Sequence, residues 1–125
     1  MVELKSNGNV GIGTDIPYNP LEVVGSSADI LVYDTDTYSQ NNSGGALAFA
    51  GKDSTGVRKT FADVRGVANG SNVGEFAIRT RHTGGTLTEV VRITSSGDFG
   101  IGTDSPDRKL DVSGTGNVYG KIQST

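Results

Sequence analysis

The sequence contains no cysteine, only three prolines and a single histidine among its 125 residues. Without cysteine, the chain can form neither a disulfide scaffold nor a metal site built from thiolates. Its longest apolar runs extend over about five residues, which is too short to span a bilayer, and no charged start followed by an apolar segment marks a signal peptide. The sequence therefore predicts no membrane insertion and carries no visible export signal.

Positive charge is also scarce. The formal net charge is −3 and the isoelectric point is about 5.0. A nucleic-acid-binding domain normally carries a basic patch, and a segment that binds an anionic membrane carries a cluster of lysines and arginines. Neither feature is present, so we expect no nucleic-acid partner and no membrane-surface segment.

The sequence is instead rich in small and β-branched residues. Glycine occurs 19 times, and glycine, serine, threonine and asparagine together supply 52 residues, so long helices are not expected. Leucine, isoleucine, valine and phenylalanine total 30 residues, which is above the range typical of disordered chains. The 13 valines and 13 threonines, against six leucines, favour strands. The composition predicts an all-β fold with a thin core.

A repeat organises the sequence. Residues 4–26 align without gaps on residues 93–115, with 11 of 23 positions identical. The shared pattern is Gly-x-x-Gly-Ile-Gly-Thr-Asp-x-Pro-x-x-x-Leu-x-Val-x-Gly. Apolar residues alternate with glycine in its first half, which predicts a strand with one apolar face and one face bare enough for close approach of another backbone. A proline then ends the strand, and the Leu-x-Val segment begins a second strand.

Eight residues define the structural joint that we expect at each copy of this repeat. They are Gly11, Ile12, Gly13 and Pro17 in the first copy, and Gly100, Ile101, Gly102 and Pro106 in the second copy. Each copy is too small to bury its own apolar face.

The region between the copies has the spacing of an antiparallel β-meander or sandwich, with roughly 14 residues per strand and turn. Five strands are expected, at residues 29–33, 46–50, 60–67, 75–81 and 88–93. The first two are continuous apolar runs, typical of strands buried on both faces, and the other three alternate apolar with charged residues. Residues 34–44 have no core periodicity and are expected to form a long loop.

This pattern divides the chain into an N-terminal joint at 1–26, a β-rich head at 27–92 and a C-terminal joint at 93–125. The head has few large apolar side chains, and oligomerisation is a usual remedy for a core that small. We therefore expect an obligate homo-oligomer.

The repeat resembles the joints of bacteriophage tail fibres and related trimeric fibre proteins, including adhesin-like surface fibres of bacteria. The residues that carry the resemblance are Val10-Gly-Ile-Gly-Thr14, Pro17 and Leu21-x-Val23, together with the segment 87–114. In many such fibres a segment like 87–114 precedes an endosialidase-type intramolecular chaperone. The upstream segments ALAFAGKDSTG, FADVRG and GEFAIRTR match the module that usually comes before it.

The resemblance implies a parallel homotrimer of intertwined short antiparallel strands, located in a virion tail fibre or on the outer surface of a bacterium. The loop-rich middle region lies between the two joints, and recognition is usually placed on loops mounted on a scaffold. We therefore expect non-enzymatic attachment to a host or prey cell through surface glycans or lipopolysaccharide. The alternative is a spacer module that adds length to a fibre without touching a receptor. The glycines of each joint would, in this assembly, let three backbones crowd together.

Candidate ligand-binding residues lie in the head. A sugar site can combine stacking rings with carboxylate and amide groups, and the loop region supplies Tyr33, Asp34, Asp36, Tyr38, Asn41 and Asn42. The plainer interpretation is a solvated loop, and a Ca²⁺ site lacks the remaining ligands of the known loop pattern.

A second group of candidates consists of Arg79, Arg81 and His82. The plainer interpretation of Arg65, Arg79, Arg81 and Arg92 is pairing, within or between chains, with Asp63, Glu75 and Glu89. The functional alternative is a patch for anions or sugar acids, because arginine matches carboxylates bidentately. His82 is either a solvated loop residue or a receptor contact. In a trimer it has a third possible role, in which the three copies of His82 bind one metal ion on the trimer axis.

The glycine motifs do not predict a nucleotide site. Ile16 and Ser105 stand where a dinucleotide-binding loop needs its third glycine, and the proline that follows prevents the helix that such a site requires. With one histidine and no recognisable pair of catalytic carboxylates, we expect no enzyme, no cofactor and no metal. A polysaccharide-degrading enzyme remains a third and weaker alternative.

Overall fold

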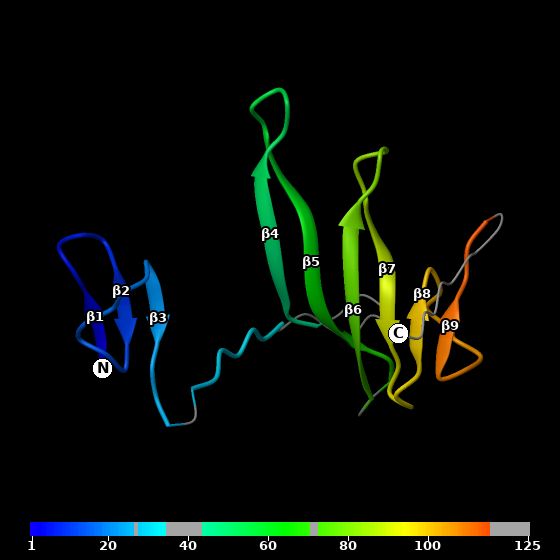
Figure 1. Cartoon of the computed structure of the whole chain (residues 1–125), viewed down its shortest axis with the longest axis horizontal. Coiled ribbons are helices and arrows are strands. Elements are labelled where there is room, and N and C mark those ends of the chain that lie inside the picture. Colours follow the sequence, from blue (N-terminus) through cyan, green and yellow to red (C-terminus); the bar gives the residue numbers. More distant parts are fainter. Residues whose placement is uncertain (27, 35–43, 71–72, 116–125) are drawn as a thin grey trace, which may run out of the picture. The chain divides into compact units, whose positions relative to one another are not determined.

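The computed structural model describes residues 1–26, 28–34, 44–70 and 73–115. All regular structure in these residues is β-structure, arranged in two sheets (Figure 1). The chain divides into two compact units, Met1–Leu31 and Val32–Thr125. The all-β prediction is thus confirmed for the part of the chain that the structure describes.

The first unit is a three-stranded sheet. Strand β1 (Val2–Leu4) pairs antiparallel with β2 (Val10–Ile12), and β2 pairs parallel with β3 (Leu21–Val23). The connection from β2 to β3 therefore carries the chain back to the end of the sheet at which β2 began. It does so in only a few residues, without a helix.

The second unit is a six-stranded sheet whose neighbours follow chain order. Its strands are β4 (Ala46–Lys52), β5 (Arg58–Ala68), β6 (Gly74–Arg81), β7 (Leu87–Ile93), β8 (Phe99–Ile101) and β9 (Leu110–Val112). Strands β4 to β8 form an antiparallel meander, whereas β8 and β9 are parallel. The meander agrees with the sequence pattern, but the expectation of antiparallel pairing throughout was wrong at β2–β3 and β8–β9.

The strand predicted at residues 29–33 was also wrong. These residues form no strand, and Ile30, Leu31 and Tyr33 are 72%, 85% and 78% exposed. An unbroken apolar run has no alternation that would fix its register against a neighbour, so it carries a weak strand signal. The run at 46–50 does form a strand, β4, but it lies at the edge of a single-layer sheet. Leu47 and Phe49 are therefore 57% and 54% exposed in one chain rather than buried.

The two copies of the repeat have the same local structure. Residue i of the first copy corresponds to residue i+89 of the second, so the pairs Val10↔Leu21 and Phe99↔Leu110 are equivalent. The antiparallel pairs Leu4↔Val10 and Ile93↔Phe99 are equivalent as well, which places the end of β7 in the role of β1. The backbone hydrogen bonds agree as closely.

Two of these backbone bonds fix the end of the second strand in each copy. The amide of Gly13 donates to the carbonyl oxygen of Met1, and Gly102 donates to Val90 in the same way, both at 3.0 Å. The amides of Val24 and Ser113 donate to Ile12 and Ile101, both at 2.8 Å. The repeat therefore specifies its own hydrogen-bond pattern, whichever sheet it is part of.

Contacts within one copy explain the glycines that the two copies share. Gly13 and Gly102 have φ values of 79° and 74°, in the left-handed region that other residues avoid. A Cβ on Gly11 would overlap the carbonyl oxygen of Thr14, and a Cβ on Gly100 would overlap that of Thr103. The close backbone approach expected at these glycines thus takes place with the chain's own connecting loop.

The connecting loop, rather than a proline, ends the strand in each copy. Strands β2 and β8 end at Ile12 and Ile101, each directly before a left-handed glycine. Pro17 and Pro106 lie further on in the loop, where Pro17 is buried and its carbonyl oxygen accepts a hydrogen bond from Asn9 Nδ2 at 3.1 Å. Proline therefore shapes the loop, and the expected role as strand terminator belongs to Gly13 and Gly102.

Candidate functional site

The two faces of the six-stranded sheet differ in chemistry. Residues directly opposite each other on paired strands project to the same face. One row runs Leu47, Val64, Ile78, Val91, Ile101 and Val112. The next row, on the other face, runs Ala46, Arg65, Ala77, Arg92, Gly100 and Asp111. We call these the apolar face and the polar face.

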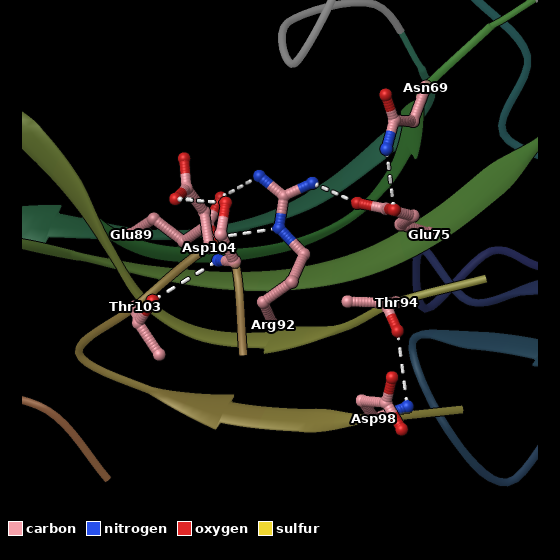
Figure 2. Close-up of polar contacts among 9 residues, drawn as sticks. Asn69, Glu75, Glu89, Arg92, Thr94, Asp98, Thr103 and Asp104 are labelled. Carbon is pink, nitrogen blue, oxygen red and sulfur yellow. Dashed lines mark hydrogen bonds and ion pairs between the residues drawn. The ribbon is translucent and has the colours of Figure 1, made fainter. Parts of the chain in front are cut away.

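Arg92 lies at the centre of the polar face and is 2% exposed. Its Nε and Nη2 donate to both carboxylate oxygens of Glu89 at 2.7 and 2.6 Å, and its Nη1 donates to Glu75 at 2.7 Å (Figure 2). Glu75 accepts a further bond from Asn69 Nδ2 at 2.7 Å. Burial alone would lower the pKa of Arg92, but the bonds to Glu89 and Glu75 outweigh burial and raise it. The guanidinium stays charged and holds both carboxylates in place.

A second ion pair joins β5 to β6 on the same face. Arg79 donates from Nε and Nη2 to the two oxygens of Asp63, at 3.0 and 2.5 Å. Asp63 is 3% exposed. The bond from Arg79 holds the pKa of Asp63 below its ordinary value, although burial opposes this, and the same bond raises the pKa of Arg79. The pairing of arginines with acidic residues expected from the sequence is therefore present for Arg79 and Arg92.

A groove of about 400 Å³ opens on the polar face beside Arg92. We call it the polar groove, and its lining residues are Thr88, Glu89, Val90, Arg92, Gly102, Thr103, Asp104 and Ser113. Strand β7 forms one wall, and the loop after β8 forms the other. The bond from the amide of Gly102 to the carbonyl of Val90 fixes this loop against β7.

The loop candidates from the sequence are only partly visible. Asp36, Tyr38, Asn41 and Asn42 lie outside the described residues. Tyr33 is exposed, and Asp34 accepts a hydrogen bond from the amide of Gly44 at 3.1 Å. Gly44 comes just before β4, so these two residues lie near the end of the sheet at which β4 begins.

Arg79, Arg81 and His82 do not lie beside those loop residues. Arg79 is engaged with Asp63, and Arg81 donates to the backbone oxygens of Thr60, at 2.6 Å, and Gly85. His82 is an exposed turn residue whose amide donates to Thr86 at 3.0 Å. The register aligns Ala46 with Ala77 through Arg65, five residues before His82. Along the strand, about 16 Å therefore separates His82 from the level of Ala46, whereas Arg79 is only about 7 Å from that level.

No group of three or more histidine, cysteine, aspartate or glutamate side chains suited to a metal ion occurs among the residues that the structure describes. The same part of the chain contains no helix of the length and apolarity needed to cross a membrane. The prediction that the chain uses neither a metal nor a cofactor stays a prediction.

The polar groove was missed by reasoning from the sequence. The charged pairs beneath it were anticipated, because Arg92 and its partners alternate with apolar residues. The groove itself depends on where the loop after β8 crosses β7, and the repeat pattern shows only that a loop is there. Comparison with known protein families and with curated proteins finds no match to this chain.

Proposed function

We propose that this chain is a segment of a trimeric fibre of a virion tail or a bacterial surface, and that it serves attachment to a host or prey cell. The observation that carries the proposal is the uncovered apolar face of the six-stranded sheet. Within the second unit, the described residues place no second layer on that face, and Leu47, Phe49, Leu110 and Val112 are between 45% and 60% exposed. A sheet with one apolar face is stable only when another layer covers it.

The buried interior of one chain is correspondingly small. Among the described residues, Val67 and Ala77 are the buried hydrophobic residues, at 2% and 0% exposure. Two such side chains supply little of the apolar burial that folding requires. Contacts with other chains would therefore supply the apolar burial that one chain lacks.

Copies of the same chain are the best candidates for the covering layer. The three-stranded sheet presents an equivalent apolar set at Val2, Leu4, Val10, Ile12, Leu21 and Val23, in the same register as β7, β8 and β9. An assembly of parallel like chains would cover each of the two apolar sets with the same kind of packing. The resemblance of the repeat to tail-fibre joints favours three chains.

Light scattering coupled to size exclusion tests this assembly. The expected mass is about three times the 12.9 kDa of one chain. Leu110→Asp should reduce the mass, because Leu110 is 60% exposed in one chain and the change costs a lone chain little. Thr83→Asp, in an exposed turn, is the matched control and should leave the mass unchanged. A folded wild-type monomer would contradict the proposal.

Attachment is tested separately, on whole cells and on glycan arrays. We expect the isolated trimer to bind cells that the complete fibre recognises, through a surface glycan or lipopolysaccharide. Failure to bind those cells would favour the alternative, a spacer without receptor contact. Release of new reducing ends from host capsule or lipopolysaccharide would contradict a non-enzymatic role.

A further inference from the structure

The polar groove is a concave site on the second unit, and neither the ion pairs nor the assembly described above gives it a role. We propose that it binds a hydroxyl-rich saccharide unit that is either uncharged or carries an ammonium group. The inference rests on the proposed attachment function and assigns it a place on the molecule.

The size of the groove suits one small ligand. A volume of about 400 Å³ lies within the range of roughly 300–1,000 Å³ typical of small-molecule sites. The walls are mostly polar, with three hydroxyl side chains and two carboxylates along the groove. This lining suits a ligand that offers many hydroxyl groups rather than an apolar ligand.

The acceptors in the groove are held rigidly before any ligand arrives. Glu89 is fixed by two bonds from the nearly buried Arg92 and keeps lone pairs on both carboxylate oxygens. Thr103 accepts the amide of Ser105 at 3.1 Å, which leaves its hydroxyl hydrogen available as a donor (Figure 2). Pre-positioned groups of this kind reduce the entropy lost on binding.

Charge decides which saccharides fit. Arg92 is paired with both Glu75 and Glu89, and Asp104 lines the same groove. The nearby guanidinium of Arg79, opposite Glu89, is already paired with Asp63, so negative charge is in excess. A sugar hydroxyl or ammonium group donates to these oxygens, and an ammonium adds attraction. A sugar acid or a phosphate would place like charges together and would be repelled.

The groove lies on the face that the proposed assembly leaves open. Arg92 belongs to the polar row of the sheet, whereas the residues that need covering belong to the apolar row. A trimer would then present three grooves, so that weak single sites act together on a glycan-coated surface.

The first copy of the repeat provides an internal control. Thr14 and Asp15 correspond to Thr103 and Asp104, but Glu3 stands at the position of Arg92 and pairs with Lys5 at 3.3 Å. The side chain that holds Glu89 in place has no counterpart there. We therefore place the saccharide site in the second copy only.

The test uses three monosaccharides with the same ring and different charge: glucose, glucosamine and glucuronate. Each is titrated into the full isotope-labelled chain, and binding is followed by the NMR shifts of backbone amides. Shifts are expected at residues 88–90 and 102–105 with glucose and glucosamine, with millimolar affinity. Glucosamine should bind about fivefold more tightly than glucose, because one hydrogen bond gains charge assistance, and glucuronate should give no shifts.

Variants assign the effect to the groove. Asp104→Asn should remove most of the preference for glucosamine, whereas Asp15→Asn, the equivalent change in the first copy, should leave it intact. Absence of shifts at 88–90 and 102–105 with all three sugars, equal binding of glucuronate, or an equal effect of the two variants would overturn the proposal. If the wild-type trimer still bound cells in that case, only the site would be wrong. If it bound no cells, the attachment function itself would be wrong.

Discussion

The two copies of the repeat adopt one backbone arrangement in two different settings. The first copy forms a complete three-stranded sheet, whereas the second completes a six-stranded sheet whose β7 takes the role of β1. Their hydrogen bonds correspond at an offset of 89 residues. The agreement extends to the bonds that the amides of Ile16 and Ser105 donate to the hydroxyl oxygens of Thr14 and Thr103. The fold of the repeat is thus set by its own residues, and the neighbouring strand decides which charges it presents.

The test of this equivalence with the largest expected effect is substitution of the glycines that have a left-handed backbone conformation. Gly13→Val and Gly102→Val each force a β-branched residue into a positive φ and drive its Cβ into the carbonyl of Val24 or Ser113. We expect a cost of about 4 kcal/mol or more at each site. Hydrogen exchange should show protection lost in the altered copy, and assembly should weaken.

Gly74→Val is the matched control for these glycine variants. A Cβ at Gly74 meets no atom within 4 Å, and its φ is not in the left-handed region. It should change the free energy of unfolding by less than about 0.5 kcal/mol. Loss of protection throughout the chain in Gly13→Val would show that the copies do not fold independently.

The next test concerns a position at which the two copies differ, because Glu3 in the first copy corresponds to Arg92 in the second. Arg92→Met leaves Glu75, whose side chain is 5% exposed, without its cation, and a broken buried pair of this kind costs about 3 kcal/mol. Glu3→Gln removes an ion pair that is 37–39% exposed, so its effect should stay below about 1 kcal/mol. Urea denaturation measures both, and equal effects would contradict the contrast.

The sequence predicted the strands in which apolar and charged residues alternate. It did not predict the direction in which strands pair or the groove that depends on a loop crossing a strand. The segments 60–67, 75–81 and 88–93 lie within β5, β6 and β7, because apolar and charged residues alternate along them. Partners for Arg79 and Arg92 were also anticipated, because oppositely charged residues are close in the pattern. The alternation of residues along one strand shows which side chains share a face, but not which other strand lies beside it.

The parallel pairs β2–β3 and β8–β9 show where this reasoning ends. Their direction is set by the loop that follows Gly13 or Gly102, which passes over Gly11 or Gly100 and fills the space of a missing side chain. The glycines signalled a close approach, but the sequence did not say which backbone approaches. The polar groove was unpredictable for the same reason, since its second wall is that loop.

A pH titration tests the ion pair that has no counterpart in the first copy, Asp63 with Arg79. The pKa of Asp63 is lowered by Arg79, so its contribution to stability is complete above the ordinary carboxyl pKa, near 4, and is lost as the pH falls through the lower folded value. Asp63→Asn should cost about 1.5 kcal/mol at pH 7. The cost should shrink below pH 4, and a cost independent of pH would contradict the role of charge.

The smallest expected effect tests the equivalence most finely. Thr14→Val and Thr103→Val each remove the hydroxyl that accepts the amide of Ile16 or Ser105 at 3.1 Å and keep the shape of the side chain. Because both amides belong to exposed residues, water replaces the lost acceptor, and each change should cost only about 0.5 kcal/mol. Thermal unfolding with local hydrogen exchange should give the same value in both copies, within error. A difference larger than the effect itself would mean that the neighbouring β7, and not the repeat alone, determines how firmly this loop is held.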